Sequence, residues 1–137
     1  MFNKYKFRVV KLKSITMHIL KEKLPVTMDS PGMKMTLQMG WGGMGVSFNE
    51  FGPMDRKASD AMFEGFPDKN CPIPHWGYMI KGSMHVRYKD GKEEVIKAGE
   101  VFYLPEGHTG WSDDEMSWIE FSPEKDMIKL SSYREKK

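Results

Sequence analysis

The chain of 137 residues lacks several features that mark whole classes of protein. It has one cysteine, Cys71, so it cannot form an internal disulfide, and we expect a reducing compartment, the cytoplasm. No apolar run approaches the roughly 20 residues that a membrane-spanning helix needs. The basic start is not followed by the apolar segment of a secretory signal. The length predicts one domain with its own core, and no membrane partner is expected.

Basic charge is also scarce outside the start of the chain. Residues 1–23 carry seven Lys/Arg against one acid, and residues 24–137 carry fourteen against eighteen. Proteins that bind nucleic acid usually show a basic stripe on the folded body, so no nucleic-acid partner is expected. The pattern predicts a basic N-terminal extension over residues 1–23, a folded domain over 24–122 and a polar C-terminal tail over 123–137.

Windows with a helical period are few. Gly and Pro interrupt the chain every few residues, and only residues 55–64 and the segment from Pro123 indicate short helices. Alternation of apolar and polar residues, or a short apolar run between turns, indicates strands over residues 33–39, 84–88, 93–96, 101–104 and 117–121. The Asp-Gly pair at 90–91 indicates a hairpin. Many short strands separated by turns predict an all-β sandwich or barrel of eight or more strands.

The residues best suited to chemistry gather around His75. Prolines at 72 and 74 favour extended backbone before each of them. In a straight extended chain Cys71 and His75 share a face but lie about 13 Å apart, so a common metal ion requires a bend between them. His108 follows in a turn after a predicted strand. Thiolate and imidazole bind zinc, iron, copper or nickel, and three such ligands suffice for an open metal site.

Each of these residues also has an ordinary structural interpretation. Cys71 suits a small buried hydrophobic position, His75 a satisfied core histidine and His108 an exposed turn. His85 alternates with apolar residues on a hairpin strand and is expected to face solvent. The thirteen methionines are expected to fill the core. Five aromatic residues could line a ligand pocket, but most of them are expected to fill the core: Trp41, Trp76, Tyr78, Trp111 and Trp118.

The segment around His75 resembles the first motif of the cupin superfamily, which reads H-x-H, three or four residues, E, six residues, G. Gly82 matches the closing glycine. His75 stands where the family has its Glu, Cys71 where it has its second His, and Lys69 where it has its first.

The segment after residue 98 resembles the second cupin motif, which reads G, five residues, P-x-G, two residues, H, three residues, N. The scaffold positions match at Gly99, Pro105 and Gly107. Gly110 stands at the histidine position, His108 lies two residues earlier, and Asp114 replaces the Asn. The chain also resembles a group of small single-domain cupins reading P-H-W-G-Y, then G, then P-x-G-H.

The resemblance covers residues 65–122 and implies a closed antiparallel β-barrel, or double-stranded β-helix jelly roll, spanning residues 24–122. It implies a pocket in the barrel mouth, often a divalent metal and often a homodimer. A leading strand over residues 5–19 would extend the partner's sheet. The altered ligand positions allow a rearranged site of His75, His108 and Cys71, with water or Glu120 as the fourth ligand, and they also allow a cupin without metal.

Three functions therefore remain open at this point. The first is a metal-binding cupin acting on a small organic molecule in the barrel pocket, with zinc, iron, copper or nickel as the ion. The second is a metal-free enzyme of isomerase or dehydratase type with His75 as general acid–base. The third is a non-catalytic cupin that binds a small ligand. The partners expected are a small molecule and a second copy of the chain.

Overall fold

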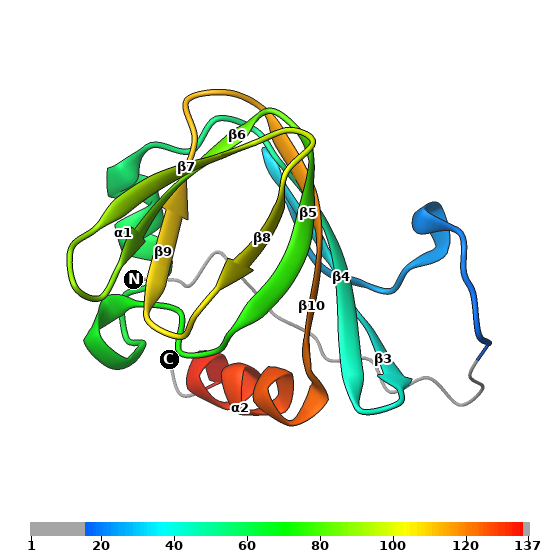
Figure 1. Cartoon of the computed structure of the whole chain (residues 1–137). Helices are drawn as coiled ribbons and strands as arrows, with labels where there is room; N and C mark the ends of the chain where they lie inside the picture. The colour runs from blue at the N-terminus through cyan, green and yellow to red at the C-terminus, as the bar shows by residue number, and fades with distance from the viewer. Residues whose placement is uncertain (1–15, 136–137) are drawn as a thin grey trace.

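The computed structural model describes residues 16–135, which form ten strands, two α-helices and two short 3₁₀ helices (Figure 1). In chain order these are η1 (Lys21–Lys23), β1 (Val26–Ser30), β2 (Met33–Thr36), β3 (Gln38–Trp41), β4 (Met44–Phe51), α1 (Arg56–Met62), η2 (Pro67–Lys69), β5 (His75–Lys81), β6 (Ser83–Tyr88), β7 (Glu93–Lys97), β8 (Val101–Leu104), β9 (His108–Trp111), β10 (Met116–Pro123) and α2 (Glu124–Glu135). The prediction of an all-β chain with eight or more strands is confirmed.

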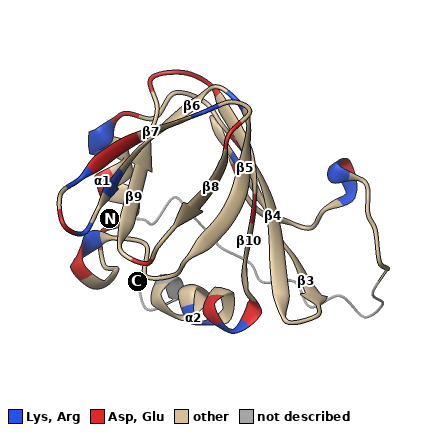
Figure 2. Cartoon of the chain, in the orientation of Figure 1, with Lys and Arg blue, Asp and Glu red and all other residues tan. Residues whose placement is uncertain are grey.

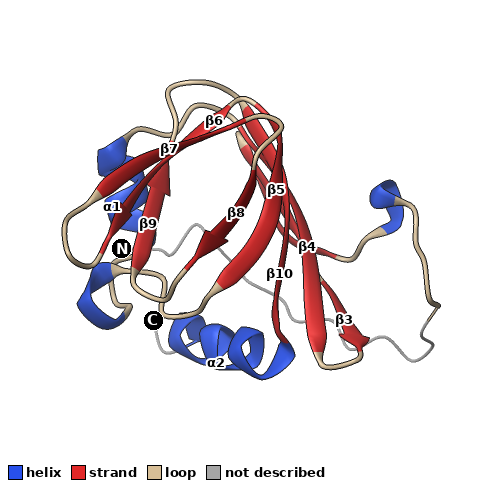
Figure 3. Ribbon diagram, viewed as in Figure 1, coloured by secondary structure: helices blue, strands red, loops and turns tan. Residues whose placement is uncertain are grey.

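The strands form two antiparallel sheets, which Figure 3 shows as the red body of the molecule. The larger sheet has the order β1-β2-β4-β10-β5-β8, with β3 also paired to β4. The smaller sheet has the order β7-β6-β9. In the larger sheet β10 lies between β4 and β5, so residues from the end of the chain stand beside residues from its middle.

The predicted strands are present with small changes at their ends. The segment predicted as one strand over residues 33–39 divides into β2 and β3 at Leu37, whose backbone N–H donates to the carbonyl of Pro25 instead. The hairpin at Asp90-Gly91 joins β6 to β7 as predicted. His108, expected in a turn, is the first residue of β9. The sequence pattern therefore located six of the ten strands, and it gave no strand prediction for β1, β4, β5 or β9.

The barrel core lies between the two sheets and is rich in methionine. Every second residue of β10 is buried, from Met116 through Trp118 and Glu120 to Ser122. The main apolar cluster joins both sheets, with Met79 and Val86 fully buried. A second cluster closes one end of the barrel and includes Cys71. The expectation that methionine fills the core is thus met for most of the described methionines.

Both helices lie where the sequence predicts them. Asp55 caps α1, because its carboxylate accepts a hydrogen bond from the backbone N–H of Ala58 at 2.8 Å. The segment predicted as a polar tail forms α2, which lies across one end of the barrel in Figure 1. Met127 and Leu130 of α2 are buried in the second apolar cluster. The helix therefore closes the end of the barrel that carries Cys71.

The predicted leading strand over residues 5–19 lies mostly outside the described residues. Its described part, from Thr16 onward, is not a strand, and the carbonyl of Thr16 accepts a hydrogen bond from the indole of Trp41 at 2.7 Å. Within residues 16–135, neither helix is long and apolar enough to cross a membrane.

Gly82, the glycine that closes the first motif, is required by both its backbone angle and its neighbours. Its φ is +74°, and a Cβ there would overlap the carbonyl oxygen of Glu115. Gly91, in the hairpin turn, has a similar φ of +88° but open space around the same position. A comparison of the two glycines therefore separates the cost of a positive φ from the cost of steric overlap at the Cβ position.

We expect Gly91→Ala to lower the free energy of unfolding by about 1–2 kcal/mol, from the left-handed backbone alone. Gly82→Ala should cost a further ~1–3 kcal/mol, because the β10 end of the sheet must move away. Urea unfolding followed by tryptophan fluorescence measures both. Equal losses in the two variants would contradict the close packing at Gly82.

Candidate metal site

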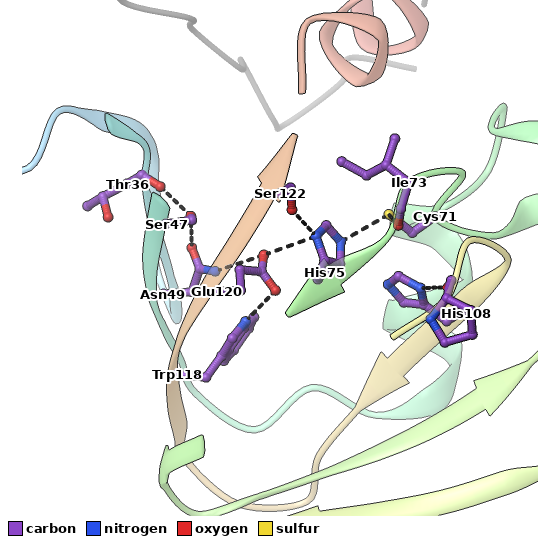
Figure 4. Close-up of polar contacts among 11 residues, drawn as sticks. Thr36, Ser47, Asn49, Cys71, Ile73, His75, His108, Trp118, Glu120 and Ser122 are labelled. Carbon is purple, nitrogen blue, oxygen red and sulfur yellow. Dashed lines mark hydrogen bonds and ion pairs between the residues drawn. The ribbon is translucent and has the colours of Figure 1, made fainter. Parts of the chain in front are cut away.

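His75 enters the barrel because β5 alternates. Its side chain is buried, the side chain of Trp76 points outward, and Met79 is again buried inside. The imidazole Nδ1 lies 2.6 Å from the hydroxyl of Ser122 on the neighbouring β10. If that nitrogen carries the proton and donates it to Ser122, then Nε2 carries the lone pair. Figure 4 shows Nε2 on the side of the ring that faces Cys71.

Cys71 is held by main-chain hydrogen bonds to the start of β9. Its backbone N–H donates to the carbonyl of His108 at 2.8 Å, and its carbonyl accepts from Gly107 N–H at 2.8 Å. The chain then bends through Pro72–Pro74, and Sγ of Cys71 comes within 3.4 Å of Nε2 of His75. The bend that a shared site requires is therefore present.

The main-chain hydrogen bonds at Cys71 form an isolated antiparallel β-bridge, in which His108 lies opposite Cys71. Its Nδ1 lies 2.6 Å from the carbonyl oxygen of Pro105. Because a carbonyl only accepts, Nδ1 carries the proton and Nε2 carries the lone pair. In other proteins a metal-binding histidine is held in place by a hydrogen bond of this kind, at the ring nitrogen that does not bind the metal.

The two-residue offset of His108 from the cupin motif has a simple cause. Side chains two apart on a strand share a face, so His108 and Gly110 both line the inside of the barrel. The imidazole has moved along β9 toward the turn without leaving the interior. There it meets Cys71, which the bridge places opposite.

The three predicted ligands are brought together. One potential ligand atom from each of Cys71, His75 and His108 lies within 4.8 Å of the other two. The rings of His75 and His108 meet edge to face, with centroids 5.0 Å apart. Ligand atoms around a tetrahedral zinc ion lie roughly 3.3–3.8 Å apart, given Zn–N of about 2.0–2.1 Å and Zn–S of about 2.3 Å. The Cys71–His75 spacing already fits, and a shift of about 1 Å at His108 completes the set.

Burial keeps both imidazoles neutral. Each is about 95% removed from solvent, with 6% of His75 and 5% of His108 exposed. Burial lowers the pKa of His75 to about 4. Burial, with the nearby His75, also lowers the pKa of His108 to about 4. At neutral pH both rings therefore offer lone pairs, the form that a metal ion binds.

Glu120 stands on the other side of His75. The even-numbered residues of β10 point inward, and Glu120 is 8% exposed. Its carboxylate accepts hydrogen bonds from the indole of Trp118 at 2.9 Å and the amide of Asn49 at 3.3 Å (Figure 4). Burial raises the pKa of this carboxyl. Its Oε1 lies 4.0 Å from Nδ1 of His75 rather than beside Sγ and Nε2, so Glu120 is outside the three-ligand group.

A cavity of about 80 Å³ adjoins the three ligands inside the barrel. Six methionines line it, together with other apolar side chains and the carboxyl of Glu120. These methionines are Met35, Met54, Met62, Met84, Met116 and Met127. A volume of this size holds a few waters. A ring compound would require the methionine side chains around it to move apart, since a cavity of roughly 150 Å³ holds benzene in another protein.

Sequence reasoning missed the groups that orient the ligands. Ser122 and the carbonyl of Pro105 fix the two imidazoles, and Asn49 with Trp118 fixes Glu120. The alternation of β10 could have indicated Ser122, because it lies two residues beyond Glu120 on the same face. The remaining described histidines are elsewhere: His85 stacks on Trp111, and His18 lies before η1.

Comparison with known proteins gives a fold and no closer relationship. No family model matches the sequence. No curated protein sequence is significantly similar to it. Similarity is found among solved structures.

One is an RmlC-like cupin from Shewanella frigidimarina, with a TM-score of 0.56 and 14% identity over 82% of this chain and 94% of that one. A second is KdgF from Halomonas sp., with a TM-score of 0.56 and 16% identity over 83% of this chain and 99% of that one. A third is HppE in its Fe(II) form, with a TM-score of 0.58 and 9% identity over 82% of this chain and 62% of that one. The chain therefore has the cupin fold, as its motifs indicate. Identities this low establish the fold alone.

The neutral histidines predict how stability depends on pH. Above the ordinary pKa of 6.5, His108 is neutral in folded and unfolded chains alike. As the pH falls below that value the unfolded chain gains a proton, while the buried ring stays neutral down to about pH 4. Stability is therefore lost as the pH falls through this window.

In chelator-containing buffer, lowering the pH from about 7 to about 5 should cost the parent ~2 kcal/mol more than it costs His108→Gln. Comparing the two proteins removes the opposite contribution of Glu120, whose raised pKa favours the folded state at low pH. Urea unfolding at several pH values measures the difference. Parallel pH profiles would show that His108 is not buried in the neutral form.

Proposed function

We propose that this cupin binds one divalent transition-metal ion through Sγ of Cys71 and Nε2 of His75 and His108. The observation that carries the proposal is the convergence of a thiol and two neutral imidazoles at one buried point. In both rings Nδ1 has its own hydrogen-bond partner. A core that merely tolerated these residues would have no need to direct three donor atoms toward one another.

One sulfur and two nitrogen donors suit zinc, iron(II), copper or nickel better than magnesium or calcium. HppE, which shares the fold, has been crystallised with Fe(II). Three protein ligands leave a position for water or substrate. A bound ion would supply a Lewis acid that polarises a substrate oxygen or lowers the pKa of a water.

The residues around this site would hold a small organic molecule beside the ion. The cavity adjoins Cys71, His75 and His108 directly, and the carboxyl of Glu120 lies on its wall. Because Trp118 and Asn49 hold Glu120 in place, its carboxyl would present a fixed hydrogen-bonding group to that molecule. The proposal includes an enzymatic role, with the reaction determined by the molecule bound.

The observed burial favours the metal site over metal-free acid–base catalysis by His75. A general acid–base works best with a pKa near the working pH. Burial lowers the pKa of His75 to about 4, which makes it a weak base at neutral pH. A thiol ligand also suits a reducing compartment, so we propose the cytoplasm as the location.

We expect the parent protein, reconstituted with Zn²⁺, Fe²⁺, Cu²⁺ or Ni²⁺, to retain about one ion per chain. His75→Ala, His108→Ala and Cys71→Ser should each lose at least ~10-fold in affinity, since even residues that only orient a ligand contribute that much. Ser122→Ala should lose ~10–100-fold for the same reason. Competition with a chelating dye measures affinity, and elemental analysis measures content.

His85→Ala serves as the matched control, because His85 is part of the barrel but not of the ligand group, and it should bind as the parent does. Replacement with Co²⁺ adds a second measurement: a thiolate-to-cobalt absorption band should appear in the parent and vanish in Cys71→Ser. Tight, stoichiometric metal in His75→Ala would reject the site.

A further inference from the structure

The described wall of the cavity contains one carboxyl, one thiol and two imidazoles, but no Lys or Arg side chain. Of the described residues that line it, those that titrate are Cys71, His75, His108 and Glu120, and no Lys or Arg is among them. A carboxylate or phosphate buried without a positive partner costs several kcal/mol. An ion of charge +2 bound to a thiolate would keep one positive charge, and an ionised Glu120 on the same wall would balance it without a charged guest.

Most of the rest of the wall is apolar and adaptable. The hydroxyls of Thr27, Thr36 and Ser47 also line it, and each already donates to a main-chain carbonyl. Six methionines surround the cavity, and their unbranched side chains repack readily around guests of different shape. Aromatic and aliphatic side chains such as Phe51, Phe63 and Leu104 complete the lining. Such a surface gains from covering a ring or a short hydrocarbon and gains little from a polyhydroxylated molecule.

We propose that the cavity binds a small, uncharged, mainly apolar molecule that presents one oxygen, nitrogen or sulfur atom to the ligand group. The inference rests on the proposed function, because it takes this cavity as the substrate site. Phosphorylated molecules and dicarboxylates are excluded because no Lys or Arg side chain of the described lining would balance their negative charges. The class of ligand is thus narrower than the fold implies.

Benzyl alcohol and benzoate test the proposal in metal-free protein, since they share a ring and differ in charge. With methionine methyl groups labelled with ¹³C, benzyl alcohol should shift the signals of the six cavity methionines. It should leave those of Met17 and Met44, which do not line the cavity, unchanged. Benzoate should bind at least ~10-fold more weakly. Comparable binding of benzoate, or no shift with benzyl alcohol, would overturn the inference. Because no metal is present, the result is independent of the metal titrations.

The outer surface of the larger sheet is a second feature of interest, separate from the cavity, because it exposes several large apolar side chains. Six exposed apolar side chains lie there on β5, β8 and β10, and we call them the outer apolar face: Trp76, Tyr78, Ile80, Val101, Tyr103 and Phe121. Each keeps 40–81% of its surface exposed. The expectation that Trp76 and Tyr78 fill the core is therefore wrong, since β5 turns them outward.

The register of the strands makes this face continuous. Trp76 stands between Phe121 on β10 and Tyr103 on β8, and its ring stacks on that of Tyr103 at 5.2 Å. Tyr78 stands opposite Val101 in the next row. Strands β5 and β8 are tan along nearly all their length in Figure 2, so charge is confined to their ends. The main helix contacts are with β9, β10 and β4, which leaves β5 and β8 uncovered.

The area and chemistry of the outer apolar face suit a second copy of the chain. Its six side chains expose on the order of 500 Å² of mostly apolar surface. A standard interface buries about 800 Å² per partner around an apolar centre with a polar rim. Residues 1–15 are a poorer occupant, because they carry five basic residues and no acid, while the face offers no countercharge.

We propose that two copies pair through this face, with a twofold axis near Tyr78 and Val101. In such a twofold pairing each chain would contribute the same six side chains. The pairing would also hold β5 and β10 in place from their outer side, because His75 alternates with Trp76 on β5 and Ser122 follows Phe121 on β10. The partner surface is thus the reverse side of the strands that carry the ligands.

Three Val→Glu variants of the full chain test the pairing by sedimentation velocity across a concentration series. The parent should be a dimer at micromolar concentration, and Val101→Glu should raise the dissociation constant at least ~10-fold, since two carboxylates meet at the axis. Val95→Glu, equally exposed but on β7 of the other sheet, should leave the dimer intact. Val9→Glu should also leave it intact. A monomeric parent would overturn the proposal, and so would a dimer that Val9→Glu breaks and Val101→Glu does not.

Discussion

The candidate site depends on the pair of main-chain hydrogen bonds that join Cys71 to Gly107 and His108. These bonds fasten the segment before β5 to the segment before β9, and so bring together residues that are more than 30 positions apart. The two prolines between Cys71 and His75 leave that segment few other conformations. With the bridge closed, the thiol faces one imidazole through the bend and the other across the bridge. Without it, β5 would still place His75 inside the barrel, but alone.

The side chains around this bridge are buried from bulk solvent, and that burial decides the chemistry available to them. Desolvation favours the neutral form of every group in the barrel, both imidazoles and the carboxyl of Glu120 alike. A cluster of neutral donors holds together without repulsion until an ion arrives, and then it supplies lone pairs without first losing protons from its histidines. The hydrogen bonds of Ser122 and Pro105 keep those lone pairs directed. The two imidazole lone pairs are thus directed before a metal ion binds.

The amino-acid pattern predicts much of this arrangement and misses the rest for physical reasons. Alternation and turn spacing located β2, β3, β6, β7, β8 and β10, but they gave no strand prediction for β1, β4, β5 or β9. Their ability to bind a metal selected Cys71, His75 and His108, although nothing local revealed the Cys71–His108 bridge, since it joins distant segments. His108 was assigned to a turn because a strand of four residues after Pro-x-Gly is too short to show a period. The outward position of Trp76 was missed because β5 was not predicted as a strand, so no alternation assigned Trp76 to a face.

Strict alternation along β5 has a consequence for how this protein can change over evolution. His75 faces inward and its neighbour Trp76 outward, and the same holds for each following pair. Loss or gain of one residue between positions 75 and 81 would exchange the two faces, placing indole where imidazole belongs. Point substitutions on the outer side leave this order intact. The length of β5 is therefore under tighter constraint than most of its individual residues, and insertions belong in the turns that precede or follow it.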